Sequence, residues 1–265
     1  MSIRLSSIAL ICMCLMLGGL AVGQSLALFD LDSLEGLWLF DEGNGNTAVD
    51  ASGKGLDGKL IGSPKWVDGQ FGKALEFDGA GAYVEIPAHS NPTKAITVSV
   101  WVQSPSPAWN QHGFLVSKRD AYILHPNLGS NAVAFPVFNG GGWNVPNAWD
   151  TGSVGPDDIT EWHMYTGTYD SATGEWKIYI DGEEASALDL TKNEIAEDID
   201  VLWIGRDQCC DPRFGSAIVD EVAIFNVALT QDEIQTIMDN GLDLAVLAVQ
   251  PNGKMTTTWG SVKAK

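Results

Sequence analysis

Two tryptophans near the middle of the chain have the chemistry of a ligand-binding loop. Trp143 and Trp149 flank Asn147 in a segment that follows three consecutive glycines, 140–142. Flat indole rings can stack on the faces of sugar rings, and amide side chains can hydrogen-bond to sugar hydroxyls. The segment therefore predicts a carbohydrate-binding loop built from Trp143, Asn147 and Trp149. The alternative is that both rings are packed in the core, as tryptophans of sandwich folds often are.

Several acidic residues lie where they could hold a hard cation. Asp50 sits in a glycine-rich turn with Asp57 nearby, and Asp220 begins an acidic strand late in the chain. Calcium prefers carboxylates combined with backbone carbonyl oxygens. The alternative for Asp50 is a turn residue whose carboxylate accepts backbone N–H groups. If calcium binds, we expect it to have a structural role.

The sequence lacks the residue patterns of an enzyme. A retaining glycosidase needs two carboxyl groups about 5 Å apart. The acidic stretch 197–200 has no second glutamate downstream, and Asp220 and Glu221 are adjacent, so they should point to opposite faces of a strand. Nucleophile-elbow, phosphate-loop and zinc-protease motifs are absent, and the histidines are scattered: His89, His112, His125 and His163. We predict no catalytic residue and no enzymatic activity.

Cys209 and Cys210 are adjacent, and the two other cysteines, Cys12 and Cys14, lie in an apolar N-terminal run. In an oxidising compartment, Cys209 and Cys210 could form a strained vicinal disulfide. The alternatives are two free thiols or pairing with another chain.

The first 23 residues have the pattern of a secretory signal peptide. Arg4 is the only charged residue before an apolar run over 8–20, and small residues end the run at 21–23. The run is shorter than the roughly 20 apolar residues needed to span a bilayer. We therefore expect a secreted or cell-surface protein that is not inserted in a membrane after cleavage of the signal.

The charge of the chain limits the partners that it can have. Thirty-four acidic residues face fifteen basic ones, a formal net charge of -19. A surface this acidic repels nucleic acid and anionic lipid. We expect an extracellular glycan or a surface protein as partner, and no nucleic acid.

Short strand-like runs with turn residues between them recur through the chain after the leader. In 96–102, apolar residues alternate with Thr97, Ser99 and Trp101, which predicts a strand with one face in the core. Asp181-Gly182 joins two such runs as a hairpin. The predicted strands are 34–40, 56–61, 74–77, 83–86, 96–102, 161–169, 175–180, 183–188, 201–204 and 217–225, with a further strand-like run at 244–249.

One helix is predicted near the C-terminus. Thr230 and Glu233 have the spacing of a capping box, and Gly241 supplies a stop. Many short strands and one helix predict an all-β fold, a two-sheet antiparallel sandwich with one short C-terminal helix. We assign 1–23 to the signal peptide, 24–243 to a single domain and 244–265 to a C-terminal tail.

Four ordered motifs resemble those of bacterial laminin-G-like jelly-roll domains, relatives of the concanavalin A-like lectins and glucanases. They are the segments 36–43, 50–58, 72–86 and 219–230. The resemblance implies a jelly roll and, through a calcium ion common in the family, a link between Asp50 and Asp220. The fold alone does not fix a function. We expect a non-catalytic binding module that recognises carbohydrate or another extracellular ligand; the alternatives are a structural or adhesive surface domain without a small ligand and, less favoured, a glycoside hydrolase.

Overall fold

The computed structural model describes residues 30–110, 115–144, 153–207 and 213–249, and in 244–249 it describes the backbone alone. The predicted signal peptide and Cys209 and Cys210 therefore lie outside the described residues.

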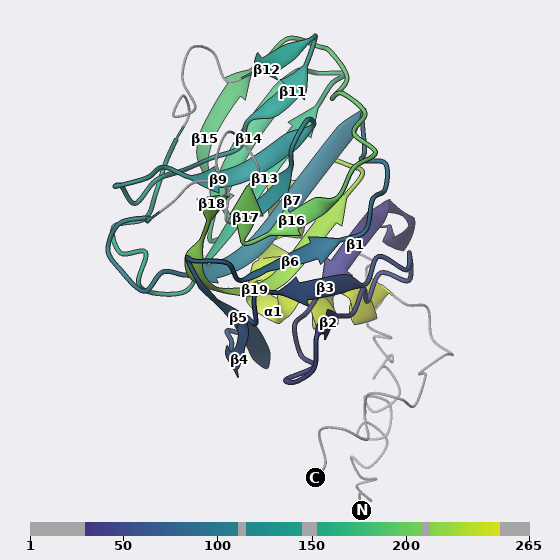
Figure 1. The fold of residues 1–265 in the computed structure, drawn as a ribbon. Coiled ribbons are helices and arrows are strands. Elements are labelled where there is room, and N and C mark those ends of the chain that lie inside the picture. The colour runs from purple at the N-terminus through teal and green to yellow at the C-terminus, as the bar shows by residue number, and fades with distance from the viewer. Residues whose placement is uncertain (1–29, 111–114, 145–152, 208–212, 250–265) are drawn as a thin grey trace, which may run out of the picture.

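Two antiparallel sheets are stacked face to face and form a sandwich (Figure 1). We call them sheet A and sheet B. Sheet A has the order β15 (Glu183–Asp189), β14 (Glu175–Ile180), β13 (His163–Asp170), β7 (Ala95–Gln103), β19 (Ser216–Phe225), β5 (Lys73–Asp78) and β4 (Lys65–Asp68), and β1 (Leu34–Trp38) also pairs with β19. Sheet B has the order β12 (Gly142–Asn144), β11 (Val137–Asn139), β9 (Tyr122–Pro126), β8 (Val116–Lys118), β16 (Leu202–Ile204), β6 (Tyr83–Ile86), β3 (Gly58–Ile61) and β2 (Thr47–Ala48), and β10 (Val133–Ala134) also pairs with β9. The predicted all-β jelly-roll sandwich is confirmed.

Three smaller elements complete the described fold. A short ribbon is formed by β17 (Arg206–Asp207) and β18 (Arg213–Phe214). A single 3₁₀ turn, η1 (Leu31–Ser33), precedes β1, and the helix α1 (Gln231–Val249) follows β19.

The main core lies between the two sheets. As the alternation in 96–102 predicted, Ile96, Val98, Val100 and Val102 of β7 are fully buried in it. Each such aliphatic side chain contributes about 1.5–3 kcal/mol of burial free energy. The packing is close at Gly167 of β13, where a Cβ atom would lie 2.3 Å from the ring of Phe135. Only a glycine therefore fits there without displacing that ring.

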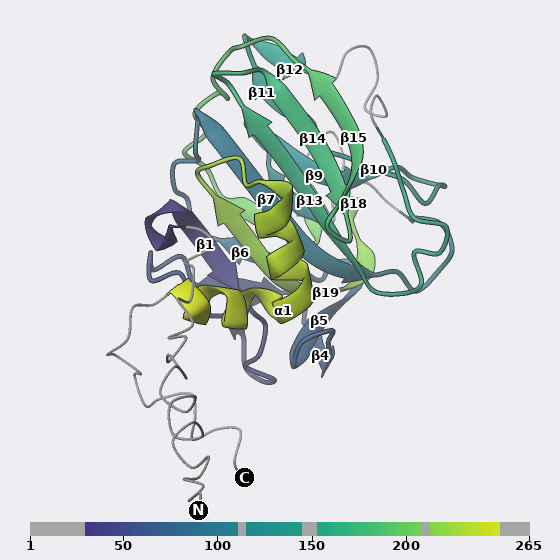
Figure 2. The same ribbon diagram turned by 180° about the vertical axis from the view of Figure 1, so that it is seen from behind.

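A second apolar cluster lies on the other face of sheet A, under helix α1 (Figure 2). Ile234 and Ile237 of the helix pack in the same cluster as Trp101 of β7 and Phe225 of β19. The capping box is present, because the Glu233 carboxylate accepts hydrogen bonds from the backbone N–H and the hydroxyl of Thr230. The helix therefore covers one outer face of the sandwich.

The C-terminal part of the helix corrects one prediction. Gly241 has a left-handed backbone (φ 74°) and interrupts the helix, as a stop signal should, but the chain is helical again beyond it. The run 244–249, which we expected to be a strand, belongs to α1. A short apolar run has no period that separates a strand from a helix, and its leucines and alanines favour the helix.

Candidate ligand-binding face

The outer face of sheet B carries polar and aromatic side chains in a row across five strands. Strand register places neighbouring residues of β3, β6, β16, β8 and β9 opposite one another. One row consists of Leu60, Val84, Ile204, Val116 and Leu124, all in the main core. The adjacent row consists of Lys59, Glu85, Trp203, Ser117 and Ile123. Because successive side chains of a strand alternate between faces, this second row points away from the core. Trp203, Ser117 and Ile123 of this row are nevertheless buried.

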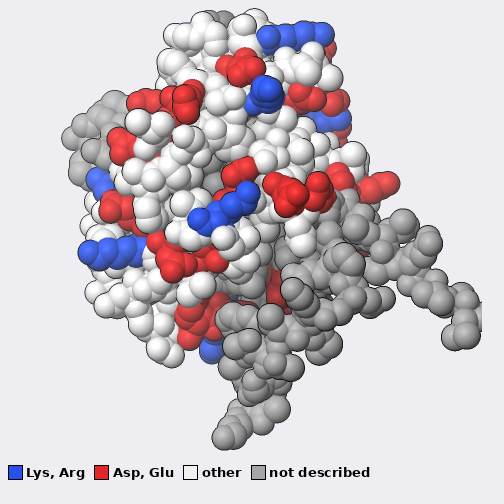
Figure 3. Space-filling model, turned by 90° about the vertical axis from the view of Figure 1, so that its right-hand side faces the viewer, with Lys and Arg blue, Asp and Glu red and all other residues white. Residues whose placement is uncertain are grey.

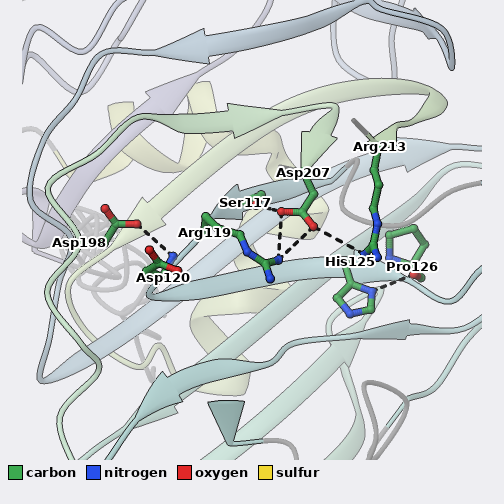
Figure 4. A network of polar contacts seen from close by, with 8 residues as sticks. All are labelled: Ser117, Arg119, Asp120, His125, Pro126, Asp198, Asp207 and Arg213. Atoms are coloured by element: carbon green, nitrogen blue, oxygen red, sulfur yellow. Dashed lines mark hydrogen bonds and ion pairs between the residues drawn. The ribbon is translucent and has the colours of Figure 1, made fainter. Parts of the chain in front are cut away.

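A buried carboxylate organises the part of this face beside β17. Asp207 is 2% exposed, and its Oδ1 accepts a hydrogen bond from the Ser117 hydroxyl at 3.1 Å. Arg119 Nη1 donates to both carboxylate oxygens, at 3.1 and 3.3 Å, and Arg213 Nη1 lies 3.8 Å from Oδ2. Figure 4 shows the two guanidinium groups directed at Asp207, one from the turn after β8 and the other from β18. Asp207 thus holds two partly exposed arginines in fixed positions.

A third arginine is held flat among aromatic rings. The Arg206 guanidinium carbon lies 4.8 Å from the ring centroid of Tyr83, 5.0 Å from Trp203 and 5.7 Å from Phe214. Nη1 of Arg206 also donates to the Tyr83 hydroxyl at 2.9 Å. Its Nε–H is buried and has no hydrogen-bond partner among the described residues. We call Arg119, Arg206, Arg213 and Asp207 the arginine patch.

Trp143 lies close to the arginine patch, at the edge of sheet B. The sequence predicted a loop for this residue, but it lies in strand β12, opposite Phe138 of β11. The two rings are in edge-to-face contact at 5.4 Å, and the Arg119 guanidinium carbon lies 5.5 Å from the Trp143 ring centroid. Trp143 is half-buried and is absent from both core clusters. Asn147 and Trp149, the other two predicted ligand-binding residues, lie outside the described residues.

Asp50 has the turn geometry that the alternative interpretation expected. Its carboxylate is buried and accepts backbone N–H groups from Leu37, Ser52 and Leu56 at 2.9–3.2 Å. These bonds tie β1 to the loop between β2 and β3.

Asp220 and Glu221 lie in a β-bulge of β19, where Glu221 has a left-handed backbone (φ 39°). The bulge interrupts the alternation on which the expected opposite orientation of the two side chains rested. Asp220 accepts N–H groups from Phe71 and Glu221. Burial, together with the charges of Glu221 and Asp41, raises the pKa of Asp220 to about 8. Burial also raises the pKa of Glu221 to about 7.

The structure gives no support to a calcium ion shared by Asp50 and Asp220. The hydrogen bonds of the two carboxylates go to different segments. Within the described residues, no group of three or more His, Cys, Asp or Glu side chains is arranged to hold a metal ion. Calcium binding stays a prediction.

Other candidate polar groups have structural roles in the described part of the chain. In the acidic stretch 197–200, Asp198 is buried and accepts the backbone N–H groups of Asp120 and Asp200. His163 lies between the Asp181 carboxylate, 2.7 Å from Nδ1, and the Asp158 carbonyl oxygen, 2.9 Å from Nε2. Both contacts favour the charged imidazolium, and the hydrogen bond to Asp181 raises the pKa of His163 most.

Sequence reasoning missed the arginine patch, although one signal was present. The chain has four arginines, of which Arg4 lies in the predicted signal peptide. Of the other three, Arg119 and Arg213 meet at Asp207, and Arg206 directly precedes Asp207 in β17. In a chain of net charge -19, one face of which shows more acidic than basic side chains (Figure 3), guanidinium groups placed this close together mark the site.

Comparison with known protein families identifies the superfamily of the chain. A family model described as the concanavalin A-like lectin/glucanases superfamily matches residues 78–235, which is more than half of the chain. The chain belongs to this superfamily. The laminin-G-like resemblance is therefore confirmed. No curated protein matches the chain, and no helix among the described residues is long and apolar enough to cross a membrane.

Several solved structures share the superfamily fold. The receptor-binding domain of a botulinum neurotoxin C/D mosaic serotype is 16% identical with a TM-score of 0.60, over 80% of this chain and 52% of that one. Domain 4 of AbnA, an extracellular arabinanase from Geobacillus stearothermophilus, solved with arabinotriose, is 18% identical with a TM-score of 0.56, over 78% of this chain and 98% of that one. The superfamily member described here thus spans about half the length of the toxin domain.

Proposed function

We propose that the chain is a non-catalytic carbohydrate-binding module, exported by its signal peptide, whose binding face is the outer face of sheet B around the arginine patch and Trp143. The observation that carries the proposal is the position of Arg119. Its guanidinium lies over the ring of Trp143 and also bonds to Asp207. Arg119 therefore links the Trp143 ring, which could stack on a sugar, to the hydrogen-bonding groups around Asp207.

The composition of this face suits sugars better than apolar ligands. Sugar rings have apolar C–H faces and many hydroxyl groups, so a binding site needs flat rings beside fixed donors and acceptors. Trp143 supplies a half-buried ring, and the hydrogen bonds to Asp207 hold the Ser117 hydroxyl and the Arg119 guanidinium in place. Preorganised side chains lose little conformational entropy when a ligand binds, and this favours affinity.

Two related folds support a carbohydrate ligand. Domain 4 of AbnA was solved in complex with arabinotriose. The binding domain of botulinum neurotoxin DC, 14% identical with a TM-score of 0.59 over 79% of this chain and 52% of that one, was solved in complex with SialylT. At these identities the likeness concerns the fold, so the ligand of this chain has to be found by experiment.

A glycan array probed with the mature protein tests the proposal, followed by calorimetry on each hit. Nuclear magnetic resonance on labelled protein then locates the bound glycan. We expect shifts to gather on β8, β12, β16 and the β17–β18 ribbon. The proposal is wrong if no glycan binds, which would favour a structural or adhesive domain. It is also wrong if the shifts gather on sheet A, or if the protein cleaves the glycan that it binds.

A further inference from the structure

A pocket opens on the outer face of sheet A, on the side of the sandwich opposite to the arginine patch. It lies where β13, β14 and β15 meet the chain segment that leads into α1 (Figure 2). Outward-facing residues of the three strands form its floor, and residues 228–231 form its wall. Its volume is about 230 Å³, below the roughly 300–1,000 Å³ of pockets that enclose drug-sized ligands. The sheet A pocket, as we call it, therefore has room for one small molecular unit.

Hydrogen bonds to the sheet hold the wall of the pocket in place. The Thr97 hydroxyl of β7 donates to the Val227 carbonyl oxygen at 2.7 Å and accepts the Leu229 N–H at 2.9 Å. The Gln231 amide donates to the Glu183 carboxylate of β15 at 3.0 Å. The wall is thus attached to sheet A at both ends, and the pocket does not depend on a ligand for its shape.

The floor of the pocket carries an ammonium group between two carboxylates. Lys177 Nζ lies 2.7 Å from Glu175 Oε1 and 3.2 Å from Glu184 Oε2. The hydrogen bond to Glu175 raises the pKa of Lys177 most, so the ammonium group stays charged. Each carboxylate has further lone pairs that can accept hydrogen bonds from a ligand.

Thr168 is the residue of the pocket that lacks a partner. It is 4% exposed and lies opposite Lys177 in the register of β13 and β14. Within the part of the chain that the structure describes, its hydroxyl forms no hydrogen bond, although it lines the pocket. Hydroxyl groups buried to this degree normally have a partner, because an unpaired one loses its hydration without compensation. A ligand in the pocket would supply that partner.

The chemistry of the pocket selects the class of ligand. An apolar molecule would strip water from the charged groups of Lys177, Glu175 and Glu184 without replacing its hydrogen bonds. An anion would be repelled by the two carboxylates. Tyr179, the aromatic residue of the lining, is 3% exposed, so its ring offers no free face for stacking. A small neutral molecule with several hydroxyl groups fits, because each hydroxyl can both donate to a carboxylate and accept from Thr168.

We infer that the sheet A pocket is a second carbohydrate site, which binds one neutral sugar unit through its hydroxyl groups and without ring stacking. The choice of a sugar among small polyols rests on the proposed function, whereas the position of the pocket does not. With sites on opposite faces of the sandwich, one molecule holds two glycan chains at once.

Nuclear magnetic resonance on labelled protein tests the inference. The probes are the methyl glycosides of glucose, galactose, mannose and arabinose. We expect at least one of them to cause saturable shifts of the backbone amides in β13, β14, β15 and residues 228–231. Thr168→Val should weaken this binding about three- to tenfold, the loss of one hydrogen bond. Glu184→Gln should weaken it by about tenfold or more, because it removes a charged acceptor.

The control variant is Thr47→Val, which makes the same change at an exposed position of β2 and should leave binding in the pocket unchanged. Without sugar, Thr168→Val should melt no lower than the unchanged protein, since its hydroxyl has no protein partner to lose. A lower melting temperature would give that hydroxyl a structural role and would overturn the inference.

The two sites can fail independently. If no probe shifts the pocket amides, or if Thr168→Val binds as tightly as the unchanged protein, the second site is wrong. The proposed function still stands in that case if array glycans shift the outer face of sheet B. If sugars shift the pocket amides alone, the second site is supported and the binding face proposed on sheet B is wrong.

Discussion

Arg119 and Asp207 are 88 residues apart in the sequence, yet Nη1 of the arginine lies 3.1 Å from a carboxylate oxygen of the aspartate. The pair joins the turn after β8 to the β17–β18 ribbon. A carboxylate that is 2% exposed needs such partners, because an unpaired buried charge is costly.

Asp207→Asn should therefore destabilise the protein. The change leaves two guanidinium groups without their shared carboxylate, and because both are partly exposed to water we expect a loss of about 1–3 kcal/mol. Urea unfolding measures it. Glu76→Gln is the matched control, since its pair with Lys65 is exposed and should contribute less than about 1 kcal/mol. Equal effects of the two variants would contradict the role given to Asp207.

Trp143→Ala should weaken glycan binding by about 1–3 kcal/mol, since a stacked ring supplies much of the contact at such sites. The fold should persist, because Trp143 is half-buried at the sheet edge and outside both core clusters. Calorimetry with an array hit gives the affinity. Trp176→Ala is the contrasting variant: that ring is fully buried, and its loss should cost about 3–5 kcal/mol of stability. Unfolding of Trp143→Ala would mean that Trp143 is a core residue.

Gly167→Ala should destabilise the sandwich. The added methyl group would lie 2.3 Å from the Phe135 ring, so the ring or the strand has to move, at about 1–3 kcal/mol or more. Thermal melting measures the loss. Gly81→Ala is the control, because its Cβ would meet no heavy atom within 4 Å. If the two variants have the same melting temperature, the packing between β13 and Phe135 is looser than described.

Stability should fall with rising pH through the titration of His163. The hydrogen bond to Asp181 raises the pKa of this imidazole above its ordinary value of 6.5. The folded state then holds the proton more tightly than the unfolded state does. Its contribution is complete below about pH 6.5 and is lost as the pH rises through the folded-state pKa.

Asp181→Asn should flatten this pH dependence while it keeps the turn. Asparagine tolerates the left-handed backbone of position 181 (φ 51°), and its amide oxygen can still accept the Met164 N–H. Urea unfolding on both sides of pH 6.5 compares the two proteins. An unchanged slope in Asp181→Asn would assign the pH dependence to other groups.

Calcium, if it binds at Asp50 and Asp220 as the family resemblance implies, should raise the melting temperature. A hundredfold excess over Kd would add about 2.7 kcal/mol to the free energy of unfolding. Because the pKa of Asp220 is raised to about 8, an ion there competes with a proton. The calcium effect should then be larger near pH 9 than near pH 6, and Asp220→Asn should remove it. Identical melting curves in chelator and in millimolar calcium would show that calcium does not bind. Magnesium at the same concentration is the control for ionic strength.

Strands with a clear period or turn signal were predictable from the sequence. The strict alternation in 96–102 identified β7 and its core face, and Asp181-Gly182 identified the β14–β15 hairpin. The strands β8 to β12 were missed. They are two to five residues long, and in β8 and β9 even the outward residues Ser117, Ile123 and His125 are buried, so their sequence shows little contrast between faces.

The candidate site was only partly predictable. Trp143 was chosen for the chemistry of its ring, and that choice needs no tertiary structure. The arginine patch depends on contacts between residues that are far apart in the chain, such as Ser117 with Asp207 and Tyr83 with Arg206. Local sequence carries no record of such contacts. The one signal was the scarcity of arginine, with three in residues 24–265. Cys209 and Cys210 stay a prediction, which intact mass before and after reduction can test.

The pairing of β1 with β19 has a mechanical consequence. The strands are antiparallel, with Leu34 opposite Phe225, so the segments that lead out of both strands leave from the same end of the pair. A pulling force applied at residues 30 and 231 would open this pair like a zipper, one hydrogen bond after another, rather than shear all its bonds together. The first event under load should be the peeling of β1 from sheet A, at low force, while the β8–β16 region and the arginine patch stay folded.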